Sequence, residues 1–387
     1  MRRPFFALLR AGLWQTPADP ALFDGLSAAD WEQLYRLSQT QTVTGITFDG
    51  MQTLPPACRP PLRLYRQWAA VTARIEHNNL RLNSAVNTLF AAYREAGIHP
   101  VLLKGQGVAT AYLRPLRRQC GDIDIYVGEQ DVATANRIIE AMGAVQDSEF
   151  VTKHFSYEWD GVHVENHRVL LQLSDPFAQR YFDRLLRQWY PHGAGTCLIA
   201  GCNVAVPPVG FNLFYIFLHA LEHILTGGIG LRQVCDWSML LSACDQQMPE
   251  GADLRRQLYH HLRRTGLLPA ARAFSYLAVH YLGVPGEHCS LALAGIEQAG
   301  EALLDDILAS GNFGKYDARV SARPPGYWAG KWHTFARACR RSVTLFRYAP
   351  REAVWHPLLL IVRMITVQAM LLRQRTRRRR HPNPPSR

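Results

Sequence analysis

The sequence predicts an α+β protein in which a mixed-sheet core is flanked by N-terminal and C-terminal helical regions. Residues 1–95 and 206–350 show mainly helical apolar periodicity, whereas residues 96–205 interleave short strand-like runs with helices. A chain of 387 residues, 48% of them apolar, is long enough to bury two or three packed units. We therefore expect three domains at these ranges, followed by an apolar helix and an arginine-rich tail at 351–387.

The first 95 residues are predicted to be helical. Apolar residues recur at intervals of three and four through DWEQLYRLSQ and IEHNNLRLNSAVNTLFAAYREAG, and Gly97 and Pro100 end the second run. The opening segment MRRPFFALLRAGLW has a basic start, but Arg10 interrupts its apolar run. This pattern favours a first amphipathic helix over a signal peptide.

Strand and helix signals alternate from residue 99 onward. The predicted order is a strand in HPVLLKG, a helix in GVATAYLRPLRRQ, a strand in GDIDIYV, a helix in DVATANRIIEAMGA, and strands in HFSYEW and VHVENHRVLLQL. Asp160-Gly161 joins the last two runs and is a strong signal for a two-residue hairpin turn. These elements predict the mixed sheet of the core.

Helical patterns return after Pro207. FNLFYIFLHALEHIL is apolar on most of its surface and is expected to be a central core helix. Further helices lead to the loop SARPPGYW, and the last two helical segments are KWHTFARACRRSVTLF and PLLLIVRMITVQAMLL. The final segment is only 16 residues long and contains Arg363, so no transmembrane helix is expected.

Basic residues are concentrated at the C-terminal end. The chain carries a net charge of +12, yet residues 315–387 hold 17 Lys and Arg against Asp317 and Glu352, and the remaining chain has 26 basic and 29 acidic residues. This asymmetry indicates a polyanionic neighbour for the C-terminal segment. The 8 cysteines form no CxxC pair, which predicts reduced thiols in a cytoplasmic protein and no zinc site.

GDIDIYV carries the sharpest chemical signal. Asp122 and Asp124 are two residues apart in a predicted strand, so both side chains project from the same face. Two adjacent carboxylates repel each other unless a hard cation neutralises them, and Mg²⁺ prefers such oxygens together with phosphate oxygens. Taken alone, the pair is explained equally well by a solvated strand end.

A glycine-containing turn precedes this strand. Lys104, Gly105, Gln106 and Gly107 follow a predicted strand and lead into a helix. Glycines allow a phosphate to approach the backbone, and the N–H groups at a helix start attract anions. An ordinary strand-to-helix turn explains KGQG by itself, but the order glycine turn, helix and DxD strand is far more specific.

The run VLLKGQGVATAYLRPLRRQCGDIDIYV resembles the core of the polymerase-beta-like nucleotidyltransferase superfamily, and more narrowly a bacterial nucleotidyltransferase family within it. The matching positions are Lys104, Gly105, Tyr112, Arg118, Asp122 and Asp124. HALEHILTGGIGLRQVCDW and DDILASGNFGKYDAR are similar too, so the resemblance covers roughly residues 95–320. It departs at Gln106, where the wider superfamily has Gly or Ser. This leaves open whether the Gln106 amide, Lys104 or backbone N–H groups contact a triphosphate.

The resemblance implies an enzyme that transfers a nucleoside monophosphate from an NTP, with ATP expected, to an unknown hydroxyl or phosphate acceptor and releases pyrophosphate. It implies Mg²⁺ or Mn²⁺ at Asp122 and Asp124, and nucleotide contacts from Lys104, Gly105, Gln106, Gly107 and Arg118. It further implies a third carboxylate on a neighbouring strand, which we assign to Glu165 as a metal ligand because the family has an acid followed two residues later by His, here His167. A solvated strand face is an equal alternative for Glu165, and Glu158 and Asp160 are the other candidates.

Several polar residues outside the core stay open to more than one interpretation. His219 and His223 lie four apart on one predicted helix, with Glu222 beside them and Arg232 and Asp236 in the next element. These residues could contact the substrate or form a buried hydrogen-bonded cluster. In a third interpretation, His219, His223 and Asp236 ligate a metal. We favour the cluster or the substrate contact. Lys315 in SGNFGKYDAR could close over phosphates, although a surface turn explains the segment better.

The C-terminal end combines an apolar helix with six arginines in RQRTRRRR. This combination predicts binding to an anionic membrane surface, in preference to RNA, and so a cytoplasmic protein that is peripheral at the inner face of the membrane. A core helix with a solvated end explains the helix alone slightly better. The rival to an enzyme is a noncatalytic protein that keeps the fold and uses this basic end for membrane or RNA attachment.

Overall fold

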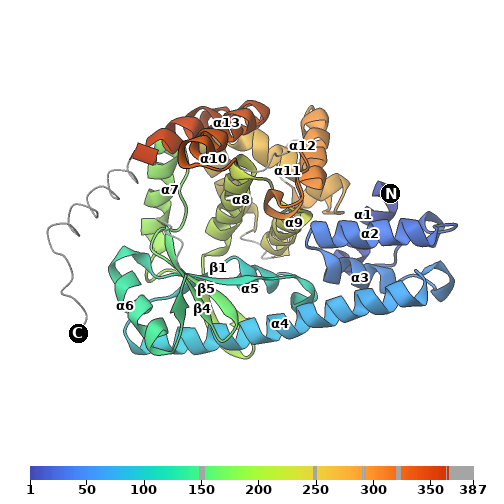
Figure 1. The fold of residues 1–387 in the computed structure, drawn as a ribbon, viewed down its shortest axis with the longest axis horizontal. Helices are drawn as coiled ribbons and strands as arrows, with labels where there is room; N and C mark the ends of the chain where they lie inside the picture. Colours follow the sequence, from blue (N-terminus) through green and yellow to red (C-terminus); the bar gives the residue numbers. More distant parts are fainter. Residues whose placement is uncertain are drawn as a thin grey trace.

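The computed structural model describes residues 1–147, 153–246, 251–289, 291, 293–319, 324–362 and 364–365. The N-terminal helices, the central sheet and the C-terminal helices come one after another in the chain and occupy separate parts of the molecule (Figure 1). The N-terminal helices lie at one end, the long helix α4 (Leu62–Glu95) runs from them beneath the sheet, and the C-terminal helices stack above the sheet. The protein is therefore mixed helix and sheet, as the sequence predicts.

The N-terminal helices are α1 (Arg2–Trp14), α2 (Ala28–Thr40) and α3 (Thr44–Gln52). Helices α1 and α3 approach so closely that a Cβ atom added at Gly12 would lie 1.8 Å from the backbone oxygen of Ile46. Glycine is required there because any side chain would collide with backbone.

The core sheet has the strand order β1-β2-β5-β4-β3. Its strands are β1 (Val101–Leu103), β2 (Asp122–Tyr126), β3 (Val145–Gln146), β4 (His154–Trp159) and β5 (Val162–His167). Strands β2 and β5 are parallel, and the other neighbours are antiparallel. Asp160 and Gly161 adopt φ angles of 49° and 66°, as the predicted two-residue hairpin turn requires.

Two predicted elements of the core are shorter in the structure. Strand β5 ends at His167 because its partners β2 and β4 end at the same level, where Tyr126 and His154 pair with His167. The helix expected in GVATAYLRPLRRQ is reduced to α5 (Gly105–Ala109) and a 3₁₀ turn at Pro115–Arg117. Pro115 has no N–H and disfavours helical geometry in the preceding residue, which explains the break.

The helices α6 (Gly128–Ala141) and α4 pack on one face of the sheet, around buried Ile123 and Ile125 of β2. The rest of the chain forms α7 (Pro176–Trp189), the hairpin β6 (Gly195–Ile199) and β7 (Cys202–Val206), α8 (Val209–Thr226), α9 (Leu231–Gln246), α10 (Gly251–Thr265), α11 (Leu268–His280), α12 (Glu297–Ser310) and α13 (Tyr327–Leu345). Residues 350–362 are also helical.

Helix α8 is the central helix of the C-terminal half. Its side chains Phe214, Phe217 and Leu218 are completely buried. Among the described residues it alone is long and apolar enough to cross a membrane, and 67% of its 18-residue window is buried inside the protein. This burial is what a core helix shows.

Candidate active site

Three carboxylates project from one face of the sheet. In the parallel pair of β2 and β5, Asp124 lies opposite Glu165, and Asp122 lies opposite His163. Residues opposite each other share a face, so Asp122, Asp124 and Glu165 lie on the same side. Glu158 lies beyond β5, on β4, so β5 separates it from β2. The register thus brings Glu165 next to Asp124, closer than the alternatives Glu158 and Asp160.

Lys104 lies against these carboxylates. Its Nζ is 2.8 Å from Oδ1 of Asp124 and 3.1 Å from Nε2 of His219. Burial lowers the pKa of Lys104, but the charge of Asp124 outweighs this and raises the pKa above its usual value. The backbone of Lys104 has a φ of 50°, a strained region for a residue other than glycine. Such strain is found mainly at functional sites, where the surroundings hold the residue in place.

Two histidines flank Glu165. His167 Nε2 lies 2.8 Å from Asp124 and 3.1 Å from Glu165, and His154 Nδ1 lies 3.4 Å from Glu165. Burial lowers the pKa of His167, but its hydrogen bonds to the two carboxylates raise it above the usual value. Burial raises the pKa of Glu165. The hydrogen bond and charge of His167 and the charge of Lys104 lower it by more, so that the pKa falls to about 2. Glu165 is therefore ionised at neutral pH.

The donor set fits a divalent cation. Ligand atoms of His154, Glu165 and His167 all lie within 4.8 Å of one another. The side chain of Asp122 has neither a hydrogen bond nor an ion pair within the described part of the chain, so its carboxylate oxygens are available. Carboxylate oxygens suit Mg²⁺ and Mn²⁺, and imidazole suits transition metals. The identity of the metal is therefore not set by these residues.

The remaining residues of the predicted nucleotide contacts lie behind the site. The Gln106 amide is 4% exposed, donates to the Asn79 carbonyl at 2.9 Å and accepts from the Cys120 thiol at 3.1 Å. A Cβ atom at Gly107 would lie 3.1 Å from Val206, which faces the core. Of the groups left open by the sequence, Lys104 and the backbone at Gly105 face the carboxylates, and the Gln106 amide does not.

Arg118 lines the site but is held by Asp236. Its guanidinium donates to both carboxylate oxygens of Asp236, at 2.6 and 2.7 Å, and the Tyr112 hydroxyl donates to the same group at 2.7 Å. All three side chains are buried. Both oxygens of Asp236 are thereby engaged, and His219, His223 and Asp236 do not form a metal-ligand cluster within the described residues.

His219 and His223 instead form a hydrogen-bonded pair, with Nε2 atoms 3.1 Å apart. Burial and the neighbouring Lys104 lower the pKa of both, to about 4 for His223, so both rings are neutral at pH 7. The ring of Phe313 packs on His223 at 4.6 Å. This arrangement favours the cluster interpretation, with His219 facing the site through Lys104.

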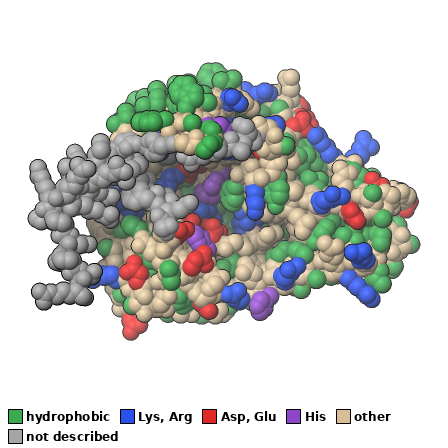
Figure 2. Space-filling model, viewed as in Figure 1, with side chains coloured by type: hydrophobic (Ala, Val, Ile, Leu, Met, Phe, Trp, Pro, Cys, Tyr) green, Lys and Arg blue, Asp and Glu red, His purple; other side chains and the backbone are tan. Residues whose placement is uncertain are grey.

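A polar pocket joins these groups. It is lined by Lys104, Gly105, Arg118, Cys120, Asp122, Asp124, Ile216, His219, Arg232, Gln233, Asp236 and Phe313. In the space-filling view, acidic, basic and histidine side chains gather between the sheet and the helices above it (Figure 2). The pocket thus brings the side chains of Lys104 and Arg118 together with the carboxylates of Asp122 and Asp124.

Sequence reasoning missed several residues of this site, among them His154 and Phe313. His154 opens β4 and reaches Glu165 only because β4 and β5 pair in register. The only available signal was that His154 and His167 are equidistant from the Asp160-Gly161 turn. Phe313 lies more than 180 residues after Asp122 and reaches the pocket through the loop after α12. The sequence singled out this loop for Lys315, but no signal pointed to the Phe313 ring.

The mixed sheet with paired carboxylates beside a lysine and a glycine turn is the arrangement that the sequence resemblance to nucleotidyltransferases implies. The sequence profile of the family described as "Uncharacterised nucleotidyltransferase" matches residues 27–283, more than half of the chain. The protein belongs to this family, and it is a nucleotidyltransferase.

Solved structures show more distant similarity. ANT(2″)-Ia in complex with adenylyl-2″-tobramycin is 12% identical, with a TM-score of 0.35, over 48% of this chain and 98% of that chain. An antigenic nucleotidyltransferase-like protein from Paracoccidioides brasiliensis is 16% identical, with a TM-score of 0.32, over 49% and 91%. Similarity at this level says nothing about the substrate. No curated protein matches the chain.

Proposed function

We propose that the enzyme transfers a nucleoside monophosphate from an NTP, with ATP as the first candidate, to a hydroxyl or phosphate oxygen of an acceptor. The supporting observation is the placement of Asp122, Asp124 and Glu165 on one face of two adjacent parallel strands, beside Lys104. In the reaction, a bond forms between the acceptor oxygen and the α-phosphorus while the bond to the bridging oxygen breaks. Pyrophosphate leaves, and the acceptor proton passes to Glu165 or to water.

Asp122 and Asp124 would hold the nucleotide-associated Mg²⁺ or Mn²⁺, and Glu165 would add the third carboxylate. When bound, the metal ions neutralise phosphate charge and lower the pKa of the acceptor hydroxyl. Lys104 supplies a permanent positive charge beside Asp124, and Gly105 leaves the backbone accessible to a phosphate. Asp122 has no competing partner in the described chain, so it is the carboxylate most open to a metal.

The same proposal includes a membrane as a partner. Large apolar side chains are exposed on α13 and on residues 350–365, namely Trp328, Trp332, Val343, Phe346, Val354, Leu358, Ile361, Val362 and Ile365. They form an apolar surface above the C-terminal helices (Figure 2). The segment that carries this surface also holds the excess of basic residues, which complements an anionic bilayer at the cytoplasmic side. The arginines of RQRTRRRR lie outside the described residues.

An acceptor screen tests the transfer reaction. The protein is incubated with each α-labelled NTP and with extracts or defined hydroxyl and phosphate compounds, with Mg²⁺, with Mn²⁺ or with EDTA. We expect metal-dependent pyrophosphate release and transfer of label from at least one NTP, and neither with EDTA. Retention of NTP binding without any turnover would favour a noncatalytic protein that keeps the fold.

A further inference from the structure

A second pocket lies against the loop 311–316, whose Phe313 lines the candidate active site. We define this arginine pocket by six of its lining residues, Asp306, Asp317, Arg319, Arg337, Arg340 and Arg341. It has a volume of about 240 Å³ and is closed on one side by Gly227, directly after α8. Four arginines and two aspartates give its lining a net positive charge.

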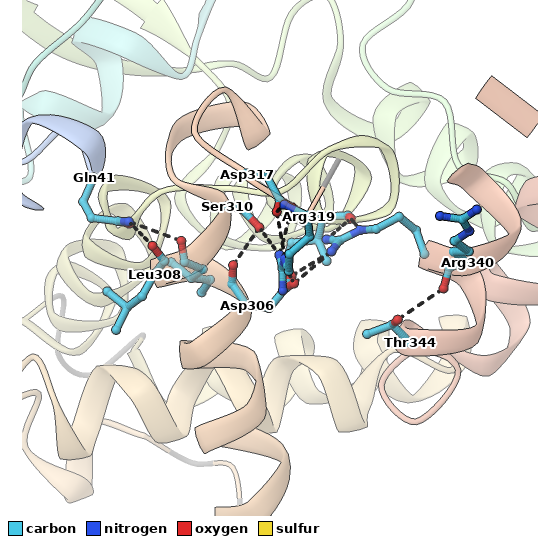
Figure 3. Close-up of polar contacts among 11 residues, drawn as sticks. Gln41, Asp306, Leu308, Ser310, Asp317, Arg319, Arg340 and Thr344 are labelled. Carbon is cyan, nitrogen blue, oxygen red and sulfur yellow. Dashed lines mark hydrogen bonds and ion pairs between the residues drawn. The ribbon is translucent and has the colours of Figure 1, made fainter. Parts of the chain in front are cut away.

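Two of the arginines are already neutralised. Arg319 donates to Asp306 at 2.9 Å and to Asp317 at 2.7 Å, and the contacts converge between α12 and the segment that follows it (Figure 3). Arg341 donates to both oxygens of Asp306, at 2.9 and 3.0 Å, and to the carbonyl of Ile224. These contacts hold the walls of the pocket together and use both acidic groups.

Arg337 and Arg340 have no acidic partner in the described part of the chain. The Nε atom of Arg337 is buried without a hydrogen-bond partner. The guanidinium of Arg340 lies apart from the interactions around Asp306, and only its backbone oxygen accepts a bond, from Thr344 (Figure 3). A buried N–H of a charged group without an acceptor is costly, so the pocket favours an anion that supplies one.

The arginine pocket approaches the active-site pocket where Gly227, which lines the first, lies close to Phe313, which lines the second. Phe313 lines the active-site pocket, and its backbone oxygen would lie 3.0 Å from a Cβ atom added at Gly227. The same added Cβ atom at Gly227 would lie 3.3 Å from Nη2 of Arg337. Gly227 therefore lets the Phe313 loop and Arg337 lie close to each other. A molecule bound by Arg337 is placed near the loop whose Phe313 lines the candidate active site.

We infer that the arginine pocket binds a phosphate group of the acceptor, so that the enzyme modifies a phosphorylated molecule. Arginine presents N–H groups in a fork that matches phosphate oxygens, and two arginines without acidic partners can share one phosphate. The assignment of this phosphate to the acceptor rests on the proposed transfer function. Anion binding itself does not depend on it.

The first test measures binding of inorganic phosphate by isothermal titration calorimetry, with EDTA and at constant ionic strength, so that neither a metal nor an NTP contributes. We expect saturable binding, and at least a tenfold higher Kd for the double variant Arg337→Ala/Arg340→Ala. Arg347→Ala is the matched control, because Arg347 is exposed, lies two residues after the end of α13 and does not line the pocket. Absence of binding in the wild type, or an equal loss in the control, would overturn the site.

The second test uses acceptors found in the screen, each compared with its dephosphorylated form. We expect the phosphorylated form to be preferred, and the double variant to raise its KM at least tenfold and more than it raises the KM for the NTP. Equal use of both forms would overturn the acceptor assignment while leaving the anion site intact. If the double variant instead loses sedimentation with anionic liposomes, the phosphate belongs to a lipid headgroup and the acceptor assignment is also overturned. Phosphate binding without any NTP turnover would reject the transfer function alone.

Discussion

At the scale of single residues, strand alternation made the carboxylates predictable. Asp122 and Asp124 share a face in any strand, and the Asp160-Gly161 turn determines where Glu165 lies along β5. The roles of Lys104 and Gln106 were not predictable in the same way. The Gln106 side chain points to the core because it hydrogen-bonds to Asn79 and Cys120. Neither residue is adjacent to Gln106 in the sequence, so no local pattern shows these contacts.

Glu165→Gln tests the third carboxylate. Because Asp122 and Asp124 would still hold the nucleotide, we expect kcat to fall by at least a hundredfold, with NTP affinity changed less than threefold. Glu158→Gln is the matched control, since Glu158 is on the neighbouring strand, is 61% exposed and pairs with His163. Steady-state kinetics and NTP titration distinguish the two. A large loss in Glu158→Gln with normal turnover in Glu165→Gln would reject the assignment.

At the scale of elements, the glycine turn, the DxD strand and the hairpin were predictable because each has a local pattern. The helix after Gly105 was overestimated, since Pro115 breaks it. The contact between the core and α9 was not predictable. It depends on a buried ion pair between Arg118 and Asp236, which are separated by more than a hundred residues and carry no pairing signal in the sequence.

Asp236→Asn should show that this pair is structural. The substitution leaves the Arg118 guanidinium buried without a countercharge, which costs about 3–5 kcal/mol when a buried pair is broken. We therefore expect a marked fall in the free energy of unfolding, measured by urea denaturation. Asp183→Asn on α7 is a control, because Asp183 has no ion pair within the described residues and should change stability by less than about 1 kcal/mol. An unchanged stability of Asp236→Asn would contradict the structural role.

At the scale of the whole molecule, the order of helical region, α/β core and helical region followed from periodicity alone. The way in which the C-terminal helices close over the sheet did not, because it depends on packing between α8 and residues far along the chain. The asymmetric charge was predictable by counting. The exposed apolar surface on α13 was not, since its spacing equally fits a buried helix.

Deletion of residues 373–387 removes seven arginines and tests the membrane proposal. We expect the full-length protein to sediment with anionic liposomes and not with neutral ones, and high salt to release much of it. The deletion should abolish sedimentation while leaving metal-dependent turnover intact. Trp332→Ser/Val343→Ser should weaken binding, whereas Leu198→Ser, which removes an exposed apolar group on β6, should not. Equal sedimentation of the truncated protein would exclude the tail, and a salt-sensitive shift of RNA without liposome binding would make nucleic acid the partner.

The proposed transfer depends on the shared face of Asp122 and Asp124, and pyrophosphate release by Asp122→Asn is the measurement that tests it. Asp122 holds no ion pair in the described structure, so its replacement should leave the fold and the unfolding transition unchanged. We expect the variant to lose metal-dependent pyrophosphate release entirely, while its circular dichroism and thermal unfolding match those of the wild type. Turnover at the wild-type rate in Asp122→Asn would contradict the placement of the metal, and with it the proposed transfer mechanism.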